Sequence, residues 1–301
     1  MTKSIVISLL FLLINPTSII AQSFDFKNRE IKSDEDLLHS VSYIYLYKKN
    51  ADSSTYSGSA YFFHSRISNK LYLITNNHLI NQIDNIGAFI ALKDKNGNAD
   101  ESYIGQFKIT LKNRIKSIQN IDLCLIDLTD YSELLSKYYF KCYSEDNIPN
   151  IKEIENLSFK DDLYCIGFSY SLFDVLNGLP IVLRGSLASL PKYDFMQQKE
   201  FAINCSNRSG SSGSPIVLNK NSKYFLLGTV RATDCGEETL YKETAKKNPI
   251  TWEKIRKIGD LQEIDSLKVN SKMEKIVVKD NFNISYVIKS SIINDILNKN
   301  K

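Results

Sequence analysis

Histidine, tryptophan, proline and glycine are all scarce in this chain, which has 3 His, 1 Trp, 6 Pro and 12 Gly among 301 residues. It contains no C-x-x-C pair and no Cys/His cluster at metal-ligand spacing, so a zinc site is not expected. No compact block of Lys and Arg accompanies the net charge of +4, so nucleic acid is not an expected partner. Neither a metal nor an organic cofactor is implied.

Long apolar runs are also lacking, except at the N-terminus. Lys3 precedes the apolar run Ile5–Ile14, which is too short to span a bilayer. Asn15-Pro16 breaks this run, and Ala21 offers a cleavage point. The pattern predicts a signal peptide over residues 1–21, with an uncleaved anchor as the alternative. We therefore expect an exported protein, periplasmic or secreted, with no stable membrane anchor after cleavage.

Aromatic residues are plentiful, with 17 Tyr and 15 Phe, and they recur in short runs together with β-branched residues. Such runs favour strands. Closely spaced runs without long helical patterns between them predict an all-β chain, an antiparallel sandwich or barrel. The predicted strands are Val41–Tyr47, Ser57–His64, Leu71–Thr75, Ala88–Leu92, Gly105–Leu111, Leu123–Leu128, Leu163–Phe168, Ile181–Ser186, Phe201–Cys205, Pro215–Leu218, Phe225–Ala232, Val277-Val278 and Ser285–Ile288.

The strands fall into two sets of similar length, and composition divides the remainder. Spacing around Trp252–Ile258 is helical, which predicts a helical insertion, and Ile292–Leu297 reads as a closing helix. The predicted units are a lead-in arm 22–40, an N-terminal β-unit 41–148, a linker 149–161, a C-terminal β-unit 162–235 plus 281–301, and an insertion 236–280.

A polar loop at Asn207–Val217 carries a serine between glycines. Gly210 and Gly213 flank Ser212 at minus two and plus one. A serine nucleophile needs an exposed hydroxyl on a tight turn, with backbone N–H groups converging beside it. Glycine permits the positive φ angles that such a turn requires. The alternative is a flexible surface turn.

The histidines offer few choices for a general base. His39 lies in the polar lead-in, His64 ends a strand, and His78 directly follows the strand Leu71–Thr75 at the edge of the predicted core. A base also needs a carboxylate to fix its tautomer, and Asp122 opens an apolar run where an unpaired carboxylate would be costly. Asp127 is the rival carboxylate, although its apolar neighbours place it within a strand.

Five cysteines are present, so at least one cannot pair within the chain. Cys124 and Cys165 lie in apolar runs and read as buried small side chains. Cys205 and Cys235 flank the serine loop, and in an exported protein a disulfide between them would staple that loop.

Together these residues resemble the chymotrypsin-fold (trypsin-like) serine peptidases, in their bacterial exported branch. The segment before His78 resembles the family's apolar-Thr-Ala-Ala-His element with both alanines replaced by asparagine, and the serine segment has the Gly-x-Ser-Gly-Ser-Pro form of glutamyl endopeptidases. The order His, Asp, Ser is also that of the family. The resemblance rests on residues 57–62 (SGSAYF), 73–78 (LITNNH), 120–125 (NIDLCL), 210–215 (GSSGSP), 225–230 (FLLGTV) and 285–293 (SYVIKSSII).

The resemblance implies two antiparallel six-stranded β-barrels and a serine endopeptidase acting on proteins or peptides. It implies a catalytic triad of His78, Asp122 and Ser212, with the backbone N–H groups of Gly210 and Ser212 as the oxyanion hole. The alternatives are an inactive binding protein on the same scaffold and an esterase with the same triad.

The residues that the resemblance places at the substrate leave specificity open. Ser206 takes the floor position of the primary pocket, so the acidic floor that selects Arg or Lys is absent. Thr229, Val230 and Arg231 fall on the strand that lines the cleft. Val230 stands where glutamyl endopeptidases carry a histidine, and Arg231, a large cation, stands where a small residue is expected.

Overall fold

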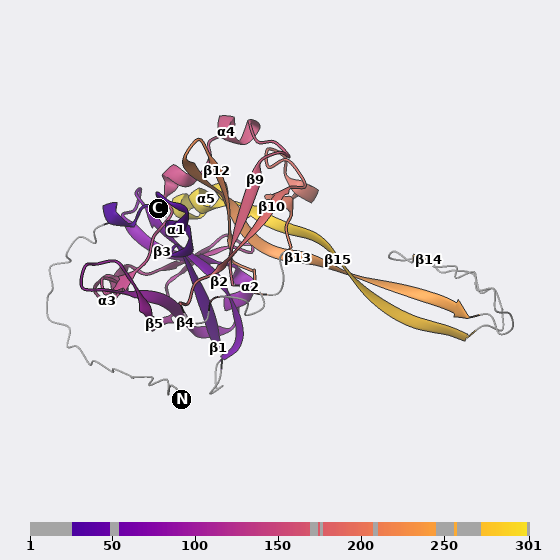
Figure 1. Ribbon diagram of the computed structural model, residues 1–301, viewed down its shortest axis with the longest axis horizontal. Coiled ribbons are helices and arrows are strands. Elements are labelled where there is room, and N and C mark those ends of the chain that lie inside the picture. Colours follow the sequence, from indigo (N-terminus) through magenta and orange to yellow (C-terminus); the bar gives the residue numbers. More distant parts are fainter. Residues whose placement is uncertain are drawn as a thin grey trace.

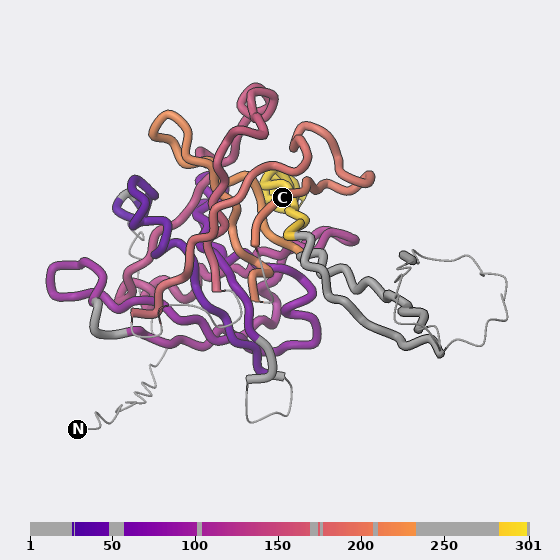
Figure 2. Tube along the Cα trace, turned by 45° about the vertical axis from the view of Figure 1, so that its right-hand side comes forward, coloured from indigo at the N-terminus to yellow at the C-terminus, as the bar shows by residue number. Residues whose placement is uncertain are grey.

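The computed structural model shows two β-rich halves (Figures 1 and 2). It describes residues 26–48, 54–168, 174, 177–206, 210–244, 256–257 and 272–299. Within these ranges the backbone alone is described at residues 27, 48, 54–56, 101–103, 233–244, 256–257 and 272–282. The predicted signal peptide, residues 1–21, lies outside the described residues.

The N-terminal half forms one antiparallel sheet, with eight strands among the described residues in the order β5-β4-β1-β2-β3-β7-β6 and β8 paired to β4. Its strands are β1 Val41–Lys48, β2 Ser54–Ser65, β3 Lys70–Thr75, β4 Ile83–Lys93, β5 Ala99–Thr110, β6 Ile115–Ser117, β7 Cys124–Asp127 and β8 Tyr138–Tyr139.

No ladder joins the two ends of this sheet among the described strands, so the expected N-terminal barrel is not closed by strand pairing. Asn113 takes a positive φ of 62°, and the Arg114 N–H bonds back to the Leu111 carbonyl at 3.0 Å, so a tight turn separates β5 from β6. The three residues of β6 then pair with β7 alone.

The C-terminal half closes into the expected six-stranded antiparallel barrel. Its strands run β12-β9-β10-β11-β15-β13, and the pairing of β12 with β13 completes the ring. Period-two alternation turns Phe201 and Ile203 of β11 into the barrel core with Val230 and Val287. The strands are β9 Asp162–Gly167, β10 Ile181–Leu187, β11 Glu200–Asn204, β12 Pro215–Lys220, β13 Lys223–Thr244, β14 Arg256–Lys257 and β15 Lys272–Lys289.

The insertion, residues 236–280, is strand wherever it is described. The strand predicted at Val277-Val278 is confirmed, whereas the helical structure predicted for the rest of the insertion is wrong in the described residues. β13 and β15 continue past the barrel as a two-stranded ribbon, paired from Cys235↔Asn281 to Thr244↔Lys272 (Figure 1). The side chains of the run Ile276-Val277-Val278 are β-branched, which favours a paired strand over a helix. Of the predicted helix Trp252–Ile258, only Arg256–Lys257 are described, as strand β14.

Short helices connect the strands. The predicted linker 149–161 contains a helix, α4, because Asn150 and Glu153 form a capping box at its start. The closing helix is present as α5, which extends the predicted range by one residue at its start and two at its end. The helices are α1 Asp34–Leu38, α2 Asn77–Ile80, α3 Ser132–Leu135, α4 Ile151–Glu155 and α5 Ser291–Lys299, with 3₁₀ turns η1 Lys27–Arg29, η2 Thr129–Tyr131, η3 Glu145–Asn147 and η4 Phe195–Gln197.

One hydrophobic cluster joins the halves. Buried side chains of α5, including Ile292 and Ile296, share it with Leu125 of the N-terminal sheet and with Ile166 and Val217 of the barrel. Burying these side chains removes apolar surface of both halves from water together. The cluster therefore holds the seam between the halves in a fixed arrangement.

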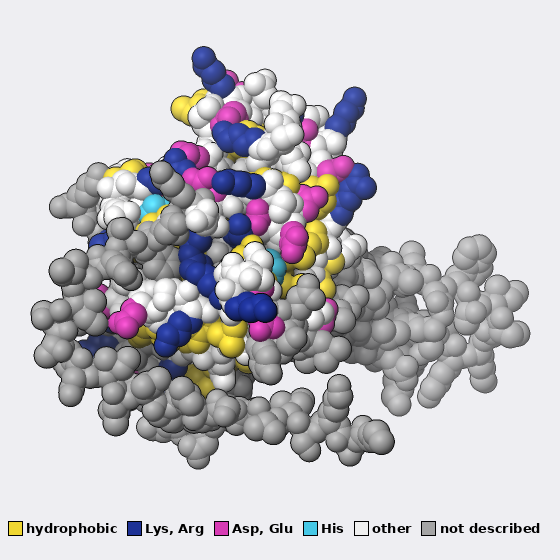
Figure 3. All heavy atoms as spheres, turned by 60° about the vertical axis from the view of Figure 1, so that its left-hand side comes forward, with side chains coloured by type: hydrophobic (Ala, Val, Ile, Leu, Met, Phe, Trp, Pro, Cys, Tyr) yellow, Lys and Arg dark blue, Asp and Glu magenta, His cyan; other side chains and the backbone are white. Residues whose placement is uncertain are grey.

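The surface shows no concentration of one charge on the face drawn in Figure 3, where Lys and Arg side chains alternate with Asp and Glu. Within the described ranges, no helix is both long and apolar enough to cross a membrane. The same residues contain no group of three or more His, Cys, Asp or Glu placed to hold a metal ion.

Candidate active site

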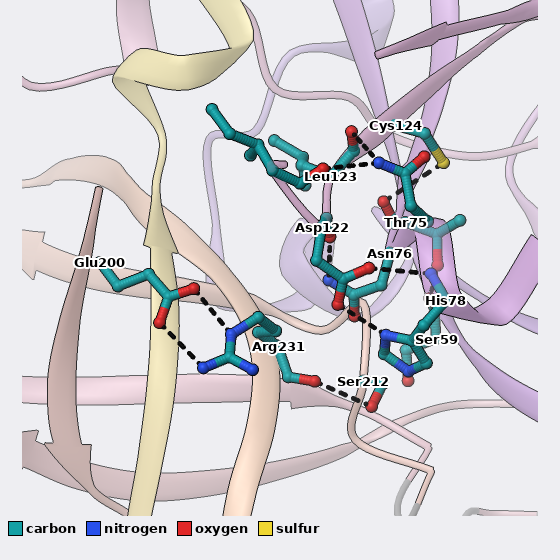
Figure 4. A network of polar contacts seen from close by, with 12 residues as sticks. Ser59, Thr75, Asn76, His78, Asp122, Leu123, Cys124, Glu200, Ser212 and Arg231 are labelled. Atoms are coloured by element: carbon teal, nitrogen blue, oxygen red, sulfur yellow. Dashed lines mark hydrogen bonds and ion pairs between the residues drawn. The ribbon is translucent and has the colours of Figure 1, made fainter. Parts of the chain in front are cut away.

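His78 and Asp122 form a two-point contact at the seam. His78 lies in α2, directly after β3, and Asp122 lies in the loop between β6 and β7. The His78 Nδ1 lies 2.6 Å from Asp122 Oδ2, and the His78 backbone N–H donates to Asp122 Oδ1 at 2.8 Å (Figure 4). Both carboxylate oxygens are therefore engaged, which fixes the imidazole ring. With the proton on Nδ1, Nε2 carries the lone pair that a base needs.

Ser212 lies beside this pair. Figure 4 shows the His78 ring next to the Ser212 side chain. The Ser212 hydroxyl donates to the Arg231 carbonyl at 3.3 Å, and no hydrogen bond joins Ser212 to His78 among the described residues. A serine hydroxyl swings between staggered positions by rotation about one bond. Catalytic hydrogen bonds are often unformed before substrate binds, so this resting geometry is compatible with a nucleophile and base pair.

The serine turn has the backbone that its glycines predict. Gly210 has a φ of 94° and Gly213 a φ of 86°, in the region that favours glycine. A Cβ at Gly213 would lie 1.9 Å from the Ser59 carbonyl oxygen, so a larger residue does not fit. The Ser212 N–H has no hydrogen-bond acceptor among the described residues, which leaves it available as an oxyanion donor.

Ser59 of β2 holds the serine turn from the opposite half. Its N–H donates to the Ser212 carbonyl at 2.9 Å, and its hydroxyl donates to the Gly210 carbonyl at 3.1 Å. The same hydroxyl accepts from the Phe168 N–H at 2.9 Å. Ser59 is fully buried, so these bonds are shielded from water. One serine thus fixes the peptide groups on both sides of the proposed oxyanion hole.

We expect Ser59→Ala to lower the rate at which a fluorophosphonate probe labels Ser212 about 10- to 100-fold. Small displacements of reacting groups lower reaction rates by factors of this size. The matched control is Ser40→Ala. Ser40 is also fully buried, and its hydroxyl also has two partners, Leu37 O at 2.7 Å and the Tyr143 hydroxyl at 3.2 Å. Each variant should lose about 1–3 kcal/mol of stability. Equal modification rates of the two folded variants would refute the role of Ser59.

The other candidate acids and bases are engaged elsewhere. His64 stacks on Phe26 with ring centroids 3.5 Å apart, and burial lowers the pKa of His39. Asp127 pairs with Lys70 at 2.9 Å. Burial alone would raise the pKa of Asp127, but hydrogen bonds from Thr129 and Lys70 lower it. Asp122, not Asp127, is therefore the carboxylate that faces His78.

The predicted substrate-binding residues have different surroundings. Thr229 is buried, with its hydroxyl 2.8 Å from that of Tyr61, and the Val230 side chain lies in the barrel core. Both can offer a substrate only backbone groups. Ser206 is exposed at the end of the described stretch before the serine turn.

Arg231 is the exception on this strand, because its side chain is part-exposed near Ser212. Its Nε and Nη2 donate to the Glu200 carboxylate at 2.7 and 3.1 Å (Figure 4). Bidentate pairing of this kind fixes the guanidinium plane and offsets its charge. The cation that the sequence places near the substrate is thus already partnered by an acid that sequence reasoning did not identify.

The predicted Cys205–Cys235 disulfide is not present. Cys205 is a buried thiol that faces the barrel core, where its hydrogen-bond partner is Cys165 of β9. That hydrogen bond lowers the pKa of Cys205. The Cys235 side chain lies outside the described residues. The prediction failed because position in the sequence does not tell which face of the chain Cys205 occupies when it leaves β11.

Besides Glu200, sequence reasoning assigned no role at the site to Ser59, Asn76 and Asn77. Ser59 lay inside a recognised segment, and the asparagines were noted as replacements of alanine. The available signal was a pair of carboxamides in front of a candidate base at the edge of a core. Buried carboxamides need hydrogen-bond partners, so this signal predicts contacts without saying with what.

Comparisons with known proteins give structural neighbours only. No family model matches the chain, and no curated protein sequence matches it. The chain is similar to the solved structure of the HtrA-type protease AlgW with a tripeptide, at 14% identity and a TM-score of 0.47, over 88% of this chain and 61% of that one. It therefore spans about three fifths of the AlgW chain.

Another similar structure is the Rv3671c protease of M. tuberculosis. Its inactive form has 11% identity and a TM-score of 0.44, over 95% of this chain and 98% of that one. Its active form has 10% identity and a TM-score of 0.43, over 96% and 94%.

Proposed function

We propose that this protein is a serine endopeptidase that hydrolyses peptide bonds through an acyl-enzyme. The single observation that carries the proposal is the His78–Asp122 pair, held at two points beside Ser212 on a turn with two glycines at positive φ. If the serine loop were only a flexible surface turn, it would not require an imidazole held in a fixed orientation beside it. Acyl transfer needs a nucleophile, a base, an orienting carboxylate and oxyanion donors.

The proposed reaction has two stages. Ser212 Oγ attacks the carbonyl carbon of the substrate while His78 Nε2 takes the hydroxyl proton, and the same proton passes to the leaving amine as the C–N bond breaks. Water then attacks the acyl group with His78 again as base, which releases the acid and restores Ser212. Asp122 stays ionised and stabilises the imidazolium. The N–H groups of Gly210 and Ser212 stabilise the oxyanion in both stages.

The proposed substrates are proteins or peptides outside the cytoplasm, in line with the predicted signal peptide. We propose no preference for acidic substrates from Arg231, because Glu200 already accepts two hydrogen bonds from its guanidinium. Apart from the hydrolytic water, the groups that act on the substrate in the proposed mechanism are side chains and backbone groups of the chain.

A fluorophosphonate probe tests this proposal without knowledge of the substrate. It reacts with a serine that a neighbouring base has activated. We expect one adduct per chain, located at Ser212 by peptide mapping, and loss of labelling in His78→Ala. An unlabelled, folded wild-type protein would overturn the proposal and favour the inactive binding protein. Labelling with hydrolysis of esters but not of amides would favour the esterase.

A further inference from the structure

The residues between β3 and His78 also form hydrogen bonds to the loop that carries Asp122. Asn76 and Asn77 immediately precede His78, and their carboxamides hydrogen-bond to the loop between β6 and β7. Figure 4 shows Asn76 beside Asp122. The Asn76 Nδ2 donates to the Asp122 carbonyl at 2.8 Å. The Asn77 Nδ2 donates to the Ile121 carbonyl at 2.6 Å and to the Leu123 carbonyl at 3.0 Å.

These bonds fall on three consecutive carbonyls centred on Asp122. With the two bonds from His78 to the Asp122 carboxylate, residues 76–78 hold residues 121–123 at five points. Asn76 is fully buried, so its bond is shielded from water. An alanine at either position has no donor for these carbonyls.

The loop needs such support, because it makes few internal hydrogen bonds in the described part of the chain. Asn120 has a φ of 66°, in the left-handed region, and the Ile121 N–H bonds to the Ile118 carbonyl at a long 3.2 Å. The Asp122 side chain is part-exposed, so packing alone does not fix it. A carboxylate must be held rigidly to keep an imidazole in one tautomer and one orientation.

We propose that Asn76 and Asn77 are positioning residues for Asp122, setting its carboxylate against His78 through the backbone of residues 121–123. The inference rests on the proposed function for its effect on catalysis, but the geometry itself can be tested apart from activity. Among the described residues, the carboxamides of the two asparagines hydrogen-bond to backbone carbonyls of the loop and not to the Ser212 hydroxyl or the imidazole. They act on the reaction only through the loop that they hold.

The kinetic test compares Asn77→Ala with the control Asn147→Ala. Asn147 is partly buried like Asn77, and its Nδ2 also donates to a backbone carbonyl, that of Tyr224 at 3.0 Å. We expect Asn77→Ala to lower the second-order rate of fluorophosphonate labelling at Ser212 about 10- to 100-fold per folded molecule. On a peptide substrate the loss should fall on kcat, with KM within about twofold. Asn147→Ala should label like the wild type.

A spectroscopic test reads the His78–Asp122 contact directly. The chain has only three histidines, so ¹⁵N-histidine labelling gives few signals, and His78→Gln assigns the one of interest. In the wild type we expect the proton on Nδ1 and slow exchange with water. In Asn77→Ala we expect exchange about tenfold faster or more, because the loop opens more often.

The two readouts separate the proposals. Unchanged exchange and unchanged labelling in Asn77→Ala would overturn the positioning role. Faster exchange in a protein that never labels would support the positioning role and overturn the peptidase. Where Asn77→Ala does not fold, Asn77→Ser serves as the second variant, because its side chain is too short to reach both carbonyls but stays polar at the partly exposed start of α2.

Discussion

Ser212→Ala is expected to lower kcat for peptide hydrolysis by about a million-fold, which is the size of the loss when a serine nucleophile is removed from a comparable site. This corresponds to about 8 kcal/mol of activation free energy. The physical reason is that the variant has no hydroxyl at position 212 to form the acyl bond. Steady-state kinetics on a fluorogenic peptide measures the loss, and the residual rate should reflect only substrate binding and oxyanion stabilisation.

The fold should survive this change, because among the described residues the Ser212 hydroxyl makes one long hydrogen bond, to the Arg231 carbonyl at 3.3 Å. The thermal midpoint should stay within a few degrees of that of the wild type. Ser136→Ala is a suitable control, since it removes an exposed hydroxyl at the end of α3. Wild-type turnover in a folded Ser212→Ala protein would rule out the proposed nucleophile.

Asp122→Asn should give the second largest loss, about ten thousand-fold in kcat. The carboxamide keeps the shape of the side chain and still accepts from the His78 N–H. Its NH₂ group, however, would face Nδ1 as a donor, so the ring would carry its proton on Nε2 and could not accept one from Ser212. The loss should be measured as kcat at neutral pH, together with the ¹⁵N-histidine spectrum, which should report the reversed tautomer.

Asp127→Asn is the matched control for that variant. It makes the same chemical change at the other carboxylate of this segment, and it removes the ion pair with Lys70. We expect a modest loss of stability and a kcat within a few-fold of the wild type, because Asp127 does not contact His78. Equal losses of kcat in Asp122→Asn and Asp127→Asn would show that both changes lower kcat by destabilising the segment, and not through the contact with His78.

The strands were predictable because each depends on local pattern. The run Val41–Tyr47 ends one residue before β1 does, and the run Leu163–Phe168 is shifted by one residue from β9. The contact between Asp122 and His78 could also be predicted from the sequence, since a carboxylate at the start of a buried strand needs a partner. The catalytic role that the sequence assigns to Ser212 stays a prediction until labelling or kinetics tests it.

Other features depend on contacts between residues that lie far apart in the sequence, and local patterns do not predict such contacts. Closure of the C-terminal sheet required β12 to pair with both β9 and β13, which no local run encodes. The sequence of the ribbon formed by β13 and β15 was interpreted as a helical insertion, because its polar and apolar residues do not clearly alternate with a period of two. The contacts of Asn77 with carbonyls 44 and 46 residues away follow from the fold alone.

Trapping the acyl-enzyme tests the central claim most directly. The wild-type protein would be mixed with a chromogenic peptide ester, quenched in acid within the first turnover, and analysed by intact mass and peptide mapping. We predict one acyl group per chain, attached at Ser212, that forms in the wild type and not in His78→Ala. Turnover of substrate with no acylated protein, or an acyl group on another residue, would contradict the account.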